Sequence, residues 1–360
     1  MDLSWSEANI AWAANLRARL ALPDESVVSG GRESLADAEI AADTEIARHL
    51  LPGSGRSLAR PEQAMLAMIE HGRALLPFPV VETVVLPGQC LAANHRFADH
   101  SHSLAEDAGD VAVAWQDPAT SDNFALRSDA VASGWQLTGR KAVVVGAPGA
   151  ARFVVAARSE ATAQLFLVEA DTCGLSLSPY MTIDGRSAAD LILEDAVVGP
   201  LNLIASGDAA ELLLARALDV TVATNCAQAV GLMRFLVDAT ACYLRERKQF
   251  GQALATFQVL QHRMVDMLLH AEMAEAATLR AMLSLDQEPD RRALAVSAAR
   301  VTTDEAARFV GQSAIQLHGG QGMRDATLAT RYFRRLTAIG LAFGNGQDHL
   351  ARVSQLASLA

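Results

Sequence analysis

Residues 247–267 read RKQFGQALATFQVLQHRMVDM and join two predicted helices. The first helix is expected to stop before Gly251 and the second to begin near Phe257. A cation such as Arg247 beside a helix C-terminus is favourable through the helix dipole alone, which is one interpretation. The other is that Arg247 is a fork-shaped donor for a pyrophosphate, with Phe250 as a flat platform nearby.

A second stretch, QLHGGQGM, occupies residues 316–323. One glycine is sufficient to cap the end of a helix. Gly319, Gly320 and Gly322 exceed that need, and residues without a Cβ let another group approach the backbone closely. The stretch therefore favours a loop pressed against a ligand or another chain.

Proline and tryptophan divide the chain into three zones. Ten of the eleven prolines lie at or before Pro200, and all four tryptophans lie at or before Trp135. Because proline breaks helix interiors, the C-terminal part is able to hold long helices. We predict an N-terminal helical domain at residues 1–108, a middle domain at 109–204 and a C-terminal helical domain at 205–360.

Apolar spacing predicts the helices of the two outer domains. The N-terminal domain is expected to hold a helix capped by Ser6 and running through Arg19, and helices at 33–51 and 61–76. The C-terminal domain is expected to hold helices at 211–247, 257–285 and 291–317, and a last helix from near residue 326. Antiparallel packing of these last four gives a four-helix bundle.

The middle domain contains short runs rich in β-formers between turn signals such as Thr138-Gly139 and Pro148-Gly149. The runs predicted as strands are residues 110–115, 134–137, 141–145, 152–157, 164–168 and 189–193. Short strands at close spacing are typical of a small barrel or sandwich. The predicted fold class is therefore α+β, mainly α, with a small β-barrel between two helical domains.

Composition excludes several classes of protein. Apolar residues make up 51% of the 360 residues and charged residues 20%, which excludes a disordered chain. The net charge of −11 argues against a general binder of nucleic acid or anionic membranes. No uncharged run approaches the ~20 residues of a membrane span, and the N-terminus lacks the basic region of a signal peptide. We expect a cytoplasmic protein whose four cysteines are reduced and buried.

Several common site motifs are absent from the sequence. It contains no G-x-G-x-x-G after a strand, no G-x-x-x-x-G-K-[ST], no H-E-x-x-H and no G-x-S-x-G. His95, His100 and His102 lie near Asp99, but polar surface histidines explain this group without a metal. No metal site is predicted.

The two glycine-containing stretches resemble the signatures of the acyl-CoA dehydrogenases. The three-zone order also matches the helical, β-barrel, helical architecture of that family. The resemblance spans nearly the whole chain and is strongest after Leu218. The ending, YFRRLTAI at 332–339 and FGNGQDHL at 343–350, is most similar to the small subunit of pimeloyl-CoA-type dehydrogenases. Those resemble the paired-subunit dehydrogenases of steroid side-chain breakdown.

The resemblance implies α,β-dehydrogenation of an acyl-CoA thioester with FAD as cofactor. In the family a carboxylate removes the α proton, the flavin accepts the β hydride, and an electron-transferring flavoprotein reoxidises the flavin. FAD lies across a subunit interface. The positions that match its pyrophosphate and adenosine contacts, partly for the neighbouring subunit's cofactor, are Arg247, Phe250, Gln258, Gln316, Gly319 and Gly320.

The catalytic base is missing from the positions where the family carries it. These positions match Phe343 and Thr221, and neither side chain is a carboxylate. Asp348 and Asp219 lie near them in sequence but reach them only if the backbone shifts. The catalytic residue is therefore left unassigned.

The middle domain also departs from the family pattern. The T-E-P-x-x-G-S-D segment near the flavin is matched by QDPATSD at residues 116–122, which lacks the glycine. The W-I-T-like segment is matched by Val143-Val144-Val145, which keeps backbone contacts to a flavin but loses the hydroxyl. The residues that contact the flavin ring in the family are therefore partly replaced here, whereas those that contact the adenosine are kept.

One hypothesis covers both departures. The chain is the partner without the base in a heteromeric enzyme, with two copies each of two chains, and the larger chain carries the glutamate. The resemblance implies a fatty-acid, dicarboxylate or steroid side-chain acyl group. Two alternatives stay open: a self-sufficient flavoenzyme with an atypical base such as Asp348, and an assembly protein on the same scaffold without a redox role.

Overall fold

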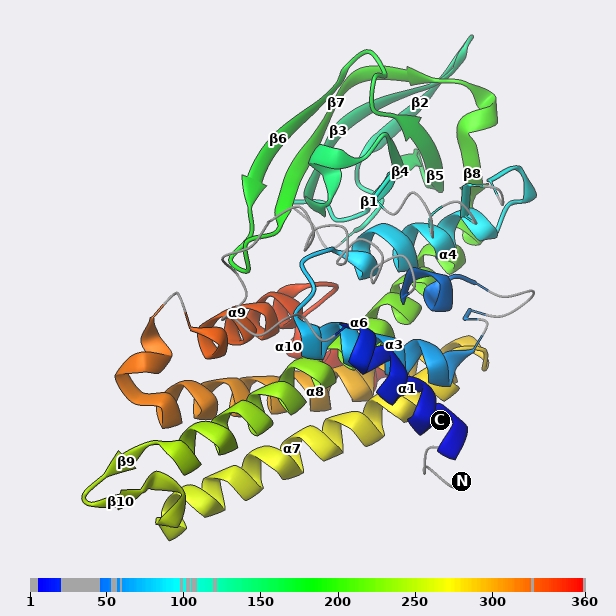
Figure 1. Cartoon of the computed structure of the whole chain (residues 1–360). Coiled ribbons are helices and arrows are strands. Elements are labelled where there is room, and N and C mark those ends of the chain that lie inside the picture. The colour runs from blue at the N-terminus through cyan, green and yellow to red at the C-terminus, as the bar shows by residue number, and fades with distance from the viewer. Residues whose placement is uncertain are drawn as a thin grey trace. The chain divides into compact units, whose positions relative to one another are not determined.

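The computed structural model describes residues 6–20, 46–52, 57–58, 60–97, 100–101, 104, 109–118, 122–324 and 327–358 (Figure 1). The chain forms two compact units. The strand unit consists of Ala47–Ala59 and Pro77–Thr221, and the helical unit of Met1–Ile46, Arg60–Leu76 and Val222–Ala360. The fold class predicted from the sequence is confirmed, whereas the predicted domain limits stay a prediction.

The strand unit is built on one eight-stranded sheet. Its strands are β1 (Val111–Ala114), β2 (Arg127–Val131), β3 (Gly134–Val145), β4 (Arg152–Ser159), β5 (Thr162–Glu169), β6 (Leu175–Met181), β7 (Ser187–Val198) and β8 (Leu203–Ser206). They follow the order β6-β7-β3-β2-β4-β5-β8, and β1 pairs in parallel with β4. Leu137, Phe153 and Phe166 are fully buried in its core. A π-helix (Val81–Val85) and α4 (Leu86–Ala92) belong to the same unit.

The strand predictions are correct in place but wrong in two details. The runs predicted at 134–137 and 141–145 form one strand, because the Thr138-Gly139 signal marks a register shift in the pairing with β7 rather than a turn. Strands β2, β6 and β8 were not predicted. Their side chains are largely exposed or only partly buried, so the sequence has no apolar run there.

The helical unit contains the long helices. Its helices are α1 (Glu7–Leu20), α3 (Pro61–Ala74), the later part of α6 (Asp208–Glu246), α7 (Gln258–Leu283), α8 (Pro289–His318), α9 (Leu328–Leu341) and α10 (Gly346–Ala357). The Ser6 hydroxyl accepts a hydrogen bond from the Asn9 N–H at 3.2 Å, which confirms the predicted cap. Helices α7 and α8 lie side by side (Figure 1).

Two predicted helices agree only in part with the structure. The helix predicted at 33–51 lies outside the described residues up to 45, and residues 46–50 are helical. The prediction of a single last helix is wrong, because the chain turns between α9 and α10. Phe343 and Gly344 have φ angles of 58° and 88° there, which no helix accommodates.

Helices α3 and α6 cross at two glycines. A Cβ on Gly231 would lie 1.9 Å from the Ile69 carbonyl oxygen, and one on Gly72 would lie 2.2 Å from the Gln228 carbonyl oxygen. The backbones therefore approach each other more closely than any side chain permits. This crossing fixes the position of α6 within the helical unit.

Helix α6 is the one described helix long and apolar enough, by length and composition, to cross a membrane. Its most apolar window is 83% buried within the fold, as expected for a core helix. The finding is weak evidence for a membrane span.

The cysteines are all free, but they are not all buried. Cys90 and Cys226 are buried as predicted, whereas Cys173 and Cys242 are exposed. Cys173 lies in the turn before β6 and Cys242 lies near the end of α6. The prediction of four buried thiols is therefore wrong for these two.

Candidate cofactor site

The two glycine-containing stretches meet at one end of the helical unit. Tyr243, in the last turns of α6, stacks on His318, the last residue of α8, with ring centroids 4.5 Å apart. Its hydroxyl also donates to the His318 carbonyl oxygen at 3.4 Å. Arg247 follows four residues after Tyr243, and Gly319 follows directly after His318. The fold thus brings together residues that the sequence separates widely.

A short hairpin continues from the end of α6. It consists of β9 (Lys248–Gln249) and β10 (Gln252–Ala253), closed by Phe250 and Gly251. Phe250 has a φ of 53° and its side chain is 90% exposed. A bulky residue in the left-handed region is strained, and such strain concentrates at binding positions. An aromatic ring held in this way at a hairpin tip is a suitable platform for a flat ligand.

The glycines in the loop after α8 differ in why a side chain is absent. A Cβ on Gly322 would lie 2.5 Å from the Ile315 carbonyl oxygen, so the chain's own packing requires that glycine. A Cβ on Gly320 would meet nothing within 4 Å. Gly319 has a φ of 59° and a ψ of −139°, a conformation that only glycine adopts easily. The absent side chain at Gly320 therefore leaves space on the solvent side.

The six residues predicted to contact a cofactor are all exposed: Arg247, Phe250, Gln258, Gln316, Gly319 and Gly320. Within the described part of the chain, the Arg247 guanidinium forms no hydrogen bond or ion pair, so its fork of donors is available. A free guanidinium, an exposed ring and an open glycine suit the diphosphate and adenosine of FAD. Their roles stay a prediction.

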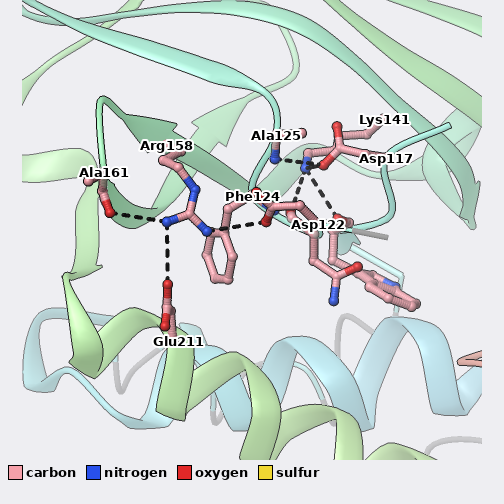
Figure 2. A network of polar contacts seen from close by, with 10 residues as sticks. Asp117, Asp122, Phe124, Ala125, Lys141, Arg158, Ala161 and Glu211 are labelled. Atoms are coloured by element: carbon pink, nitrogen blue, oxygen red, sulfur yellow. Dashed lines mark hydrogen bonds and ion pairs between the residues drawn. The ribbon is translucent and has the colours of Figure 1, made fainter. Parts of the chain in front are cut away.

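A buried lysine bonds to residues at both ends of the segment that matches the family's flavin-side loop (Figure 2). The Lys141 ammonium donates to Asp117 Oδ2 at 2.6 Å and to the carbonyl oxygens of Trp115 and Asn123 at 3.2 and 2.7 Å. Lys141 is completely buried, and burial lowers its pKa to about 8 although Asp117 opposes the shift. The sequence analysis did not single out this lysine, although it is a charged residue within a predicted strand, directly before the apolar residues 142–145.

The second carboxylate of that segment is also engaged. Asp122 accepts from the Phe124 N–H at 2.9 Å and from Arg158 at 3.2 Å. Partial burial acts to raise the pKa of Asp122, but these two donors outweigh it and hold the pKa below its usual value. Arg158 also reaches Glu211 (Figure 2). Asp117 and Asp122 are thus both engaged by donors of the strand unit.

The Val143 segment lies at a β-bulge of the strand unit. Val143 has a φ of 54°, which is strained for a β-branched residue, and its side chain is 48% exposed. Its N–H donates to Asp190 Oδ1 at 3.0 Å, and the Tyr180 hydroxyl donates to the same oxygen at 2.9 Å. Bulges of this kind commonly re-aim a strand beside a binding site.

The four residues considered for the base are not placed to act as one. Phe343 has no ionisable group, and the Thr221 hydroxyl donates to the Ala217 carbonyl oxygen at 2.7 Å. Asp348 accepts from the Asn345 N–H at 2.9 Å and completes the capping box of α10. Asp219 is buried and has interactions of its own.

The histidine group falls partly outside the structure. Asp99 and His102 lie outside the described residues, whereas His95 begins a short 3₁₀ helix. Among the residues whose placement is described, no three His, Cys, Asp or Glu side chains gather closely enough to hold a metal ion.

The fold resembles that of the acyl-CoA dehydrogenases, and part of the chain matches a model of that family. Residues 212–356 match the family described as acyl-CoA dehydrogenase, C-terminal domain. The C-terminal part of the chain is similar to this family, and solved structures of the family share the fold of the whole chain.

Curated relatives align with part of the chain. The probable acyl-CoA dehydrogenase YngJ of Bacillus subtilis is 32% identical over 190 residues, covering 52% of this chain and 49% of its own length. The short-chain specific mitochondrial acyl-CoA dehydrogenase of Homo sapiens is 32% identical over 232 residues, covering 61% and 56%. The chain thus spans about half the length of the curated relatives it matches.

Solved structures align over nearly the whole chain. The Tcur3481-Tcur3483 steroid ACAD variant is 27% identical with a TM-score of 0.79, covering 96% of this chain and 93% of that one. The ChsE4-ChsE5 complex from Mycobacterium tuberculosis is 20% identical with a TM-score of 0.84, covering 100% of both chains. A glutaryl-CoA dehydrogenase from Mycobacterium smegmatis in complex with FADH2 is 16% identical with a TM-score of 0.83, covering 99% and 96%. The latter two likenesses establish the fold.

Proposed function

We propose that this chain is a subunit of an FAD-dependent acyl-CoA dehydrogenase and works beside a larger chain that carries the catalytic glutamate. The observation that carries the proposal is an asymmetry. The adenosine-side residues Arg247, Phe250 and Gly320 are exposed and available, whereas Phe343 and Thr221 occupy the positions of the base. Two structural neighbours, the Tcur3481-Tcur3483 enzyme and the ChsE4-ChsE5 complex, are named as pairs of chains, which supports a heteromer.

The chain's own residues would bind and orient rather than transfer protons. The Arg247 guanidinium would donate two parallel hydrogen bonds to a diphosphate, and the Phe250 ring would cover an aromatic face. Backbone at Gly319 and Gly320 would approach the ligand closely. FAD, when bound, supplies the acceptor for the β hydride of the acyl-CoA. An electron-transferring flavoprotein is the proposed oxidant, and the acyl group is of the fatty-acid, dicarboxylate or steroid side-chain type.

Mild affinity purification from the native host tests this proposal. Intact mass and flavin absorbance are read on the same sample. The expected result is a larger dehydrogenase-like chain in equal amount, with fewer flavins than polypeptides. A chain that purifies alone and yellow, with one flavin per polypeptide, overturns the heteromer and favours a self-sufficient flavoenzyme. A colourless complex overturns the redox role.

Replacing Arg247 by alanine is expected to weaken flavin retention by the complex about 10- to 100-fold, because a charge-assisted hydrogen bond contributes roughly 1.5–3 kcal/mol. Stability should change little, since the Arg247 side chain has no partner in the described part of the chain. Flavin fluorescence after dilution measures the retention, and thermal unfolding measures the fold. Arg245→Ala is the matched control, because among the described residues the Arg245 side chain bonds only to the Ala241 carbonyl oxygen of its own helix. If both variants lost flavin retention equally, Arg247 would act only through its positive charge and not through specific hydrogen bonds.

A further inference from the structure

A cavity of about 660 Å³ lies between α8, α9 and α10 of the helical unit. Its volume is in the range of small-molecule sites. Two glycines keep side chains out of it: a Cβ on Gly340 would meet nothing within 4 Å, and one on Gly346 would lie 3.3 Å from Asp304 Oδ2. The six residues of the candidate cofactor site are not among those that line it. Its apolar side chains include Val301, Phe333, Leu336, Leu341 and Leu350.

Asp304 places a mostly buried carboxylate in the wall of this cavity, with a side chain that is 15% exposed. Arg300 Nε lies 3.2 Å from Asp304 Oδ1, and the Gly346 backbone N–H also faces the carboxylate. Among the described residues, neither contact has the distance and angle of a full hydrogen bond. Both carboxylate oxygens of Asp304 therefore retain the capacity to accept one.

Arg300 compensates this carboxylate only in part, because its guanidinium also serves the end of α9. Arg300 is fully buried, and its Nη2 donates to the carbonyl oxygens of Ile339, Ala342 and Gly344 at 2.5, 2.9 and 3.2 Å. Burial raises the pKa of Asp304 to about 6, although Arg300 acts to lower it. A buried carboxylate with too few donors is costly, and a cationic donor from outside the chain would offset that cost.

We propose that this cavity binds a primary amine with an apolar chain, whose ammonium group donates to Asp304 while the chain lies between Phe333 and Leu350. An ammonium group supplies both the donors and the positive charge that the Asp304 oxygens lack. A carboxylate or phosphate ligand would meet the like charge of Asp304 instead. A neutral apolar molecule would fill the cavity but leave the carboxylate without a donor.

The charge of Asp304 decides which ligand the cavity takes. The other charged residues of the lining, Glu305 and Arg308, are both exposed and opposite in sign, so their effects on a ligand largely cancel. The lining residues from α9 and α10 are uncharged. Cys226 on α6 is near Asp304, and burial raises the pKa of its thiol to about 11, so it stays neutral at pH 5–7. The site goes beyond the proposed function and needs no cofactor.

Isothermal titration calorimetry of the purified full chain with n-hexylamine tests the site. Hexylamine should bind, whereas 1-hexanol and hexanoate, which have the same carbon chain, should bind about tenfold more weakly or less. Asp304→Asn should weaken hexylamine binding about 10- to 100-fold, because a charge-assisted hydrogen bond is lost. Glu305→Gln is the matched control, since it removes the neighbouring exposed charge, and it should change the dissociation constant less than about threefold.

The pH dependence of hexylamine binding is a second readout. Hexylamine keeps its proton at neutral pH, as a lysine side chain does, so its affinity follows the ionisation of Asp304. Because the pKa of that carboxyl is about 6, the affinity should fall about tenfold from pH 7 to pH 5. The Asp304→Asn variant should lack this dependence.

Because Asp304→Asn leaves Arg300 without its counterion, a second variant keeps that pair. Gly340→Leu fills the cavity and should abolish hexylamine binding, with far-ultraviolet circular dichroism as the check on folding. Three results overturn the proposal: a wild-type chain that does not bind hexylamine, hexanol or hexanoate bound as tightly, or folded variants that both bind like the wild type. Displacement of hexylamine by adenosine monophosphate also overturns it, because the cavity then takes a nucleotide. Flavin retention tests the proposed function separately.

Discussion

The Lys141→Met variant is expected to lose about 3–5 kcal/mol of unfolding free energy in the strand unit. Lys141 has no exposed surface, and Asp117 is almost as deeply buried. Removing the ammonium leaves the Asp117 carboxylate without its counterion and also leaves the carbonyl oxygens of Trp115 and Asn123 without their donor. A broken buried pair of this kind is far more damaging than a missing surface pair.

Urea unfolding followed by the fluorescence of Trp115 and Trp135 measures this loss, in a Trp5→Phe/Trp12→Phe background. Arg127→Met is the matched control, since Arg127 and Asp129 form a pair at 2.9 Å whose side chains are 65% and 50% exposed. That control should change stability by less than about 1 kcal/mol. The double variant Lys141→Met/Asp117→Leu should recover much of the loss. If Lys141→Met lowers the unfolding free energy no more than Arg127→Met does, the buried Lys141–Asp117 pair does not stabilise the strand unit.

The pH dependence of the unfolding free energy is a second test of the Lys141→Met variant. Because burial lowers the pKa of Lys141 from 10.5 to about 8, the unfolded chain holds this proton more tightly than the folded one. The unfolding free energy of the wild type should therefore rise as the pH increases from about 8 to 10.5. The Lys141→Met variant should lack that rise.

The Gly231→Ala variant is expected to lose about 3 kcal/mol of stability in the helical unit. The added Cβ would lie 1.9 Å from the Ile69 oxygen and 3.0 Å from the Arg73 nitrogen, both of them backbone atoms of α3. A flexible side chain could move aside, but here the whole of α3 must shift, and overpacking of this kind commonly costs about 1–3 kcal/mol or more. Gly72→Ala strains the same crossing from the other helix and should act in the same direction.

Thermal unfolding of the full chain measures the effect. Gly340→Ala is the control, because Gly340 lies in α9, has an ordinary φ and has no atom within 4 Å of an added Cβ. That substitution should be neutral or stabilise by up to about 1 kcal/mol. A Gly231→Ala variant as stable as wild type would show that α3 moves away from α6 without strain.

The helices were predictable because their signals are local. The ends predicted for α6, α7 and α8 agree with the structure to within three residues, since proline, glycine and apolar spacing all act over one or two turns. The break at Phe343 was not predictable from the apolar pattern, which continues through it. The polar strands β2 and β6 form because neighbouring strands supply their hydrogen bonds, and a single sequence does not show those neighbours.

The sequence predicted which residue types form the candidate site, but not how the fold brings them together. Glycines and cations in the two stretches were visible in sequence, whereas the stacking of Tyr243 on His318 depends on how α6 and α8 pack. Gly320 and Gly322 look equivalent in sequence. Only the position of the Ile315 oxygen shows that one serves the fold and the other leaves space.

The Tyr243–His318 contact also has an entropic consequence. It fixes the hairpin after α6 and the glycine loop after α8 relative to each other before any ligand arrives. Ordering a free residue costs roughly 1–2 kcal/mol, and here that cost is met during folding of the bundle. A ligand that spans both segments therefore meets a preorganised surface, and more of the contact energy remains as affinity.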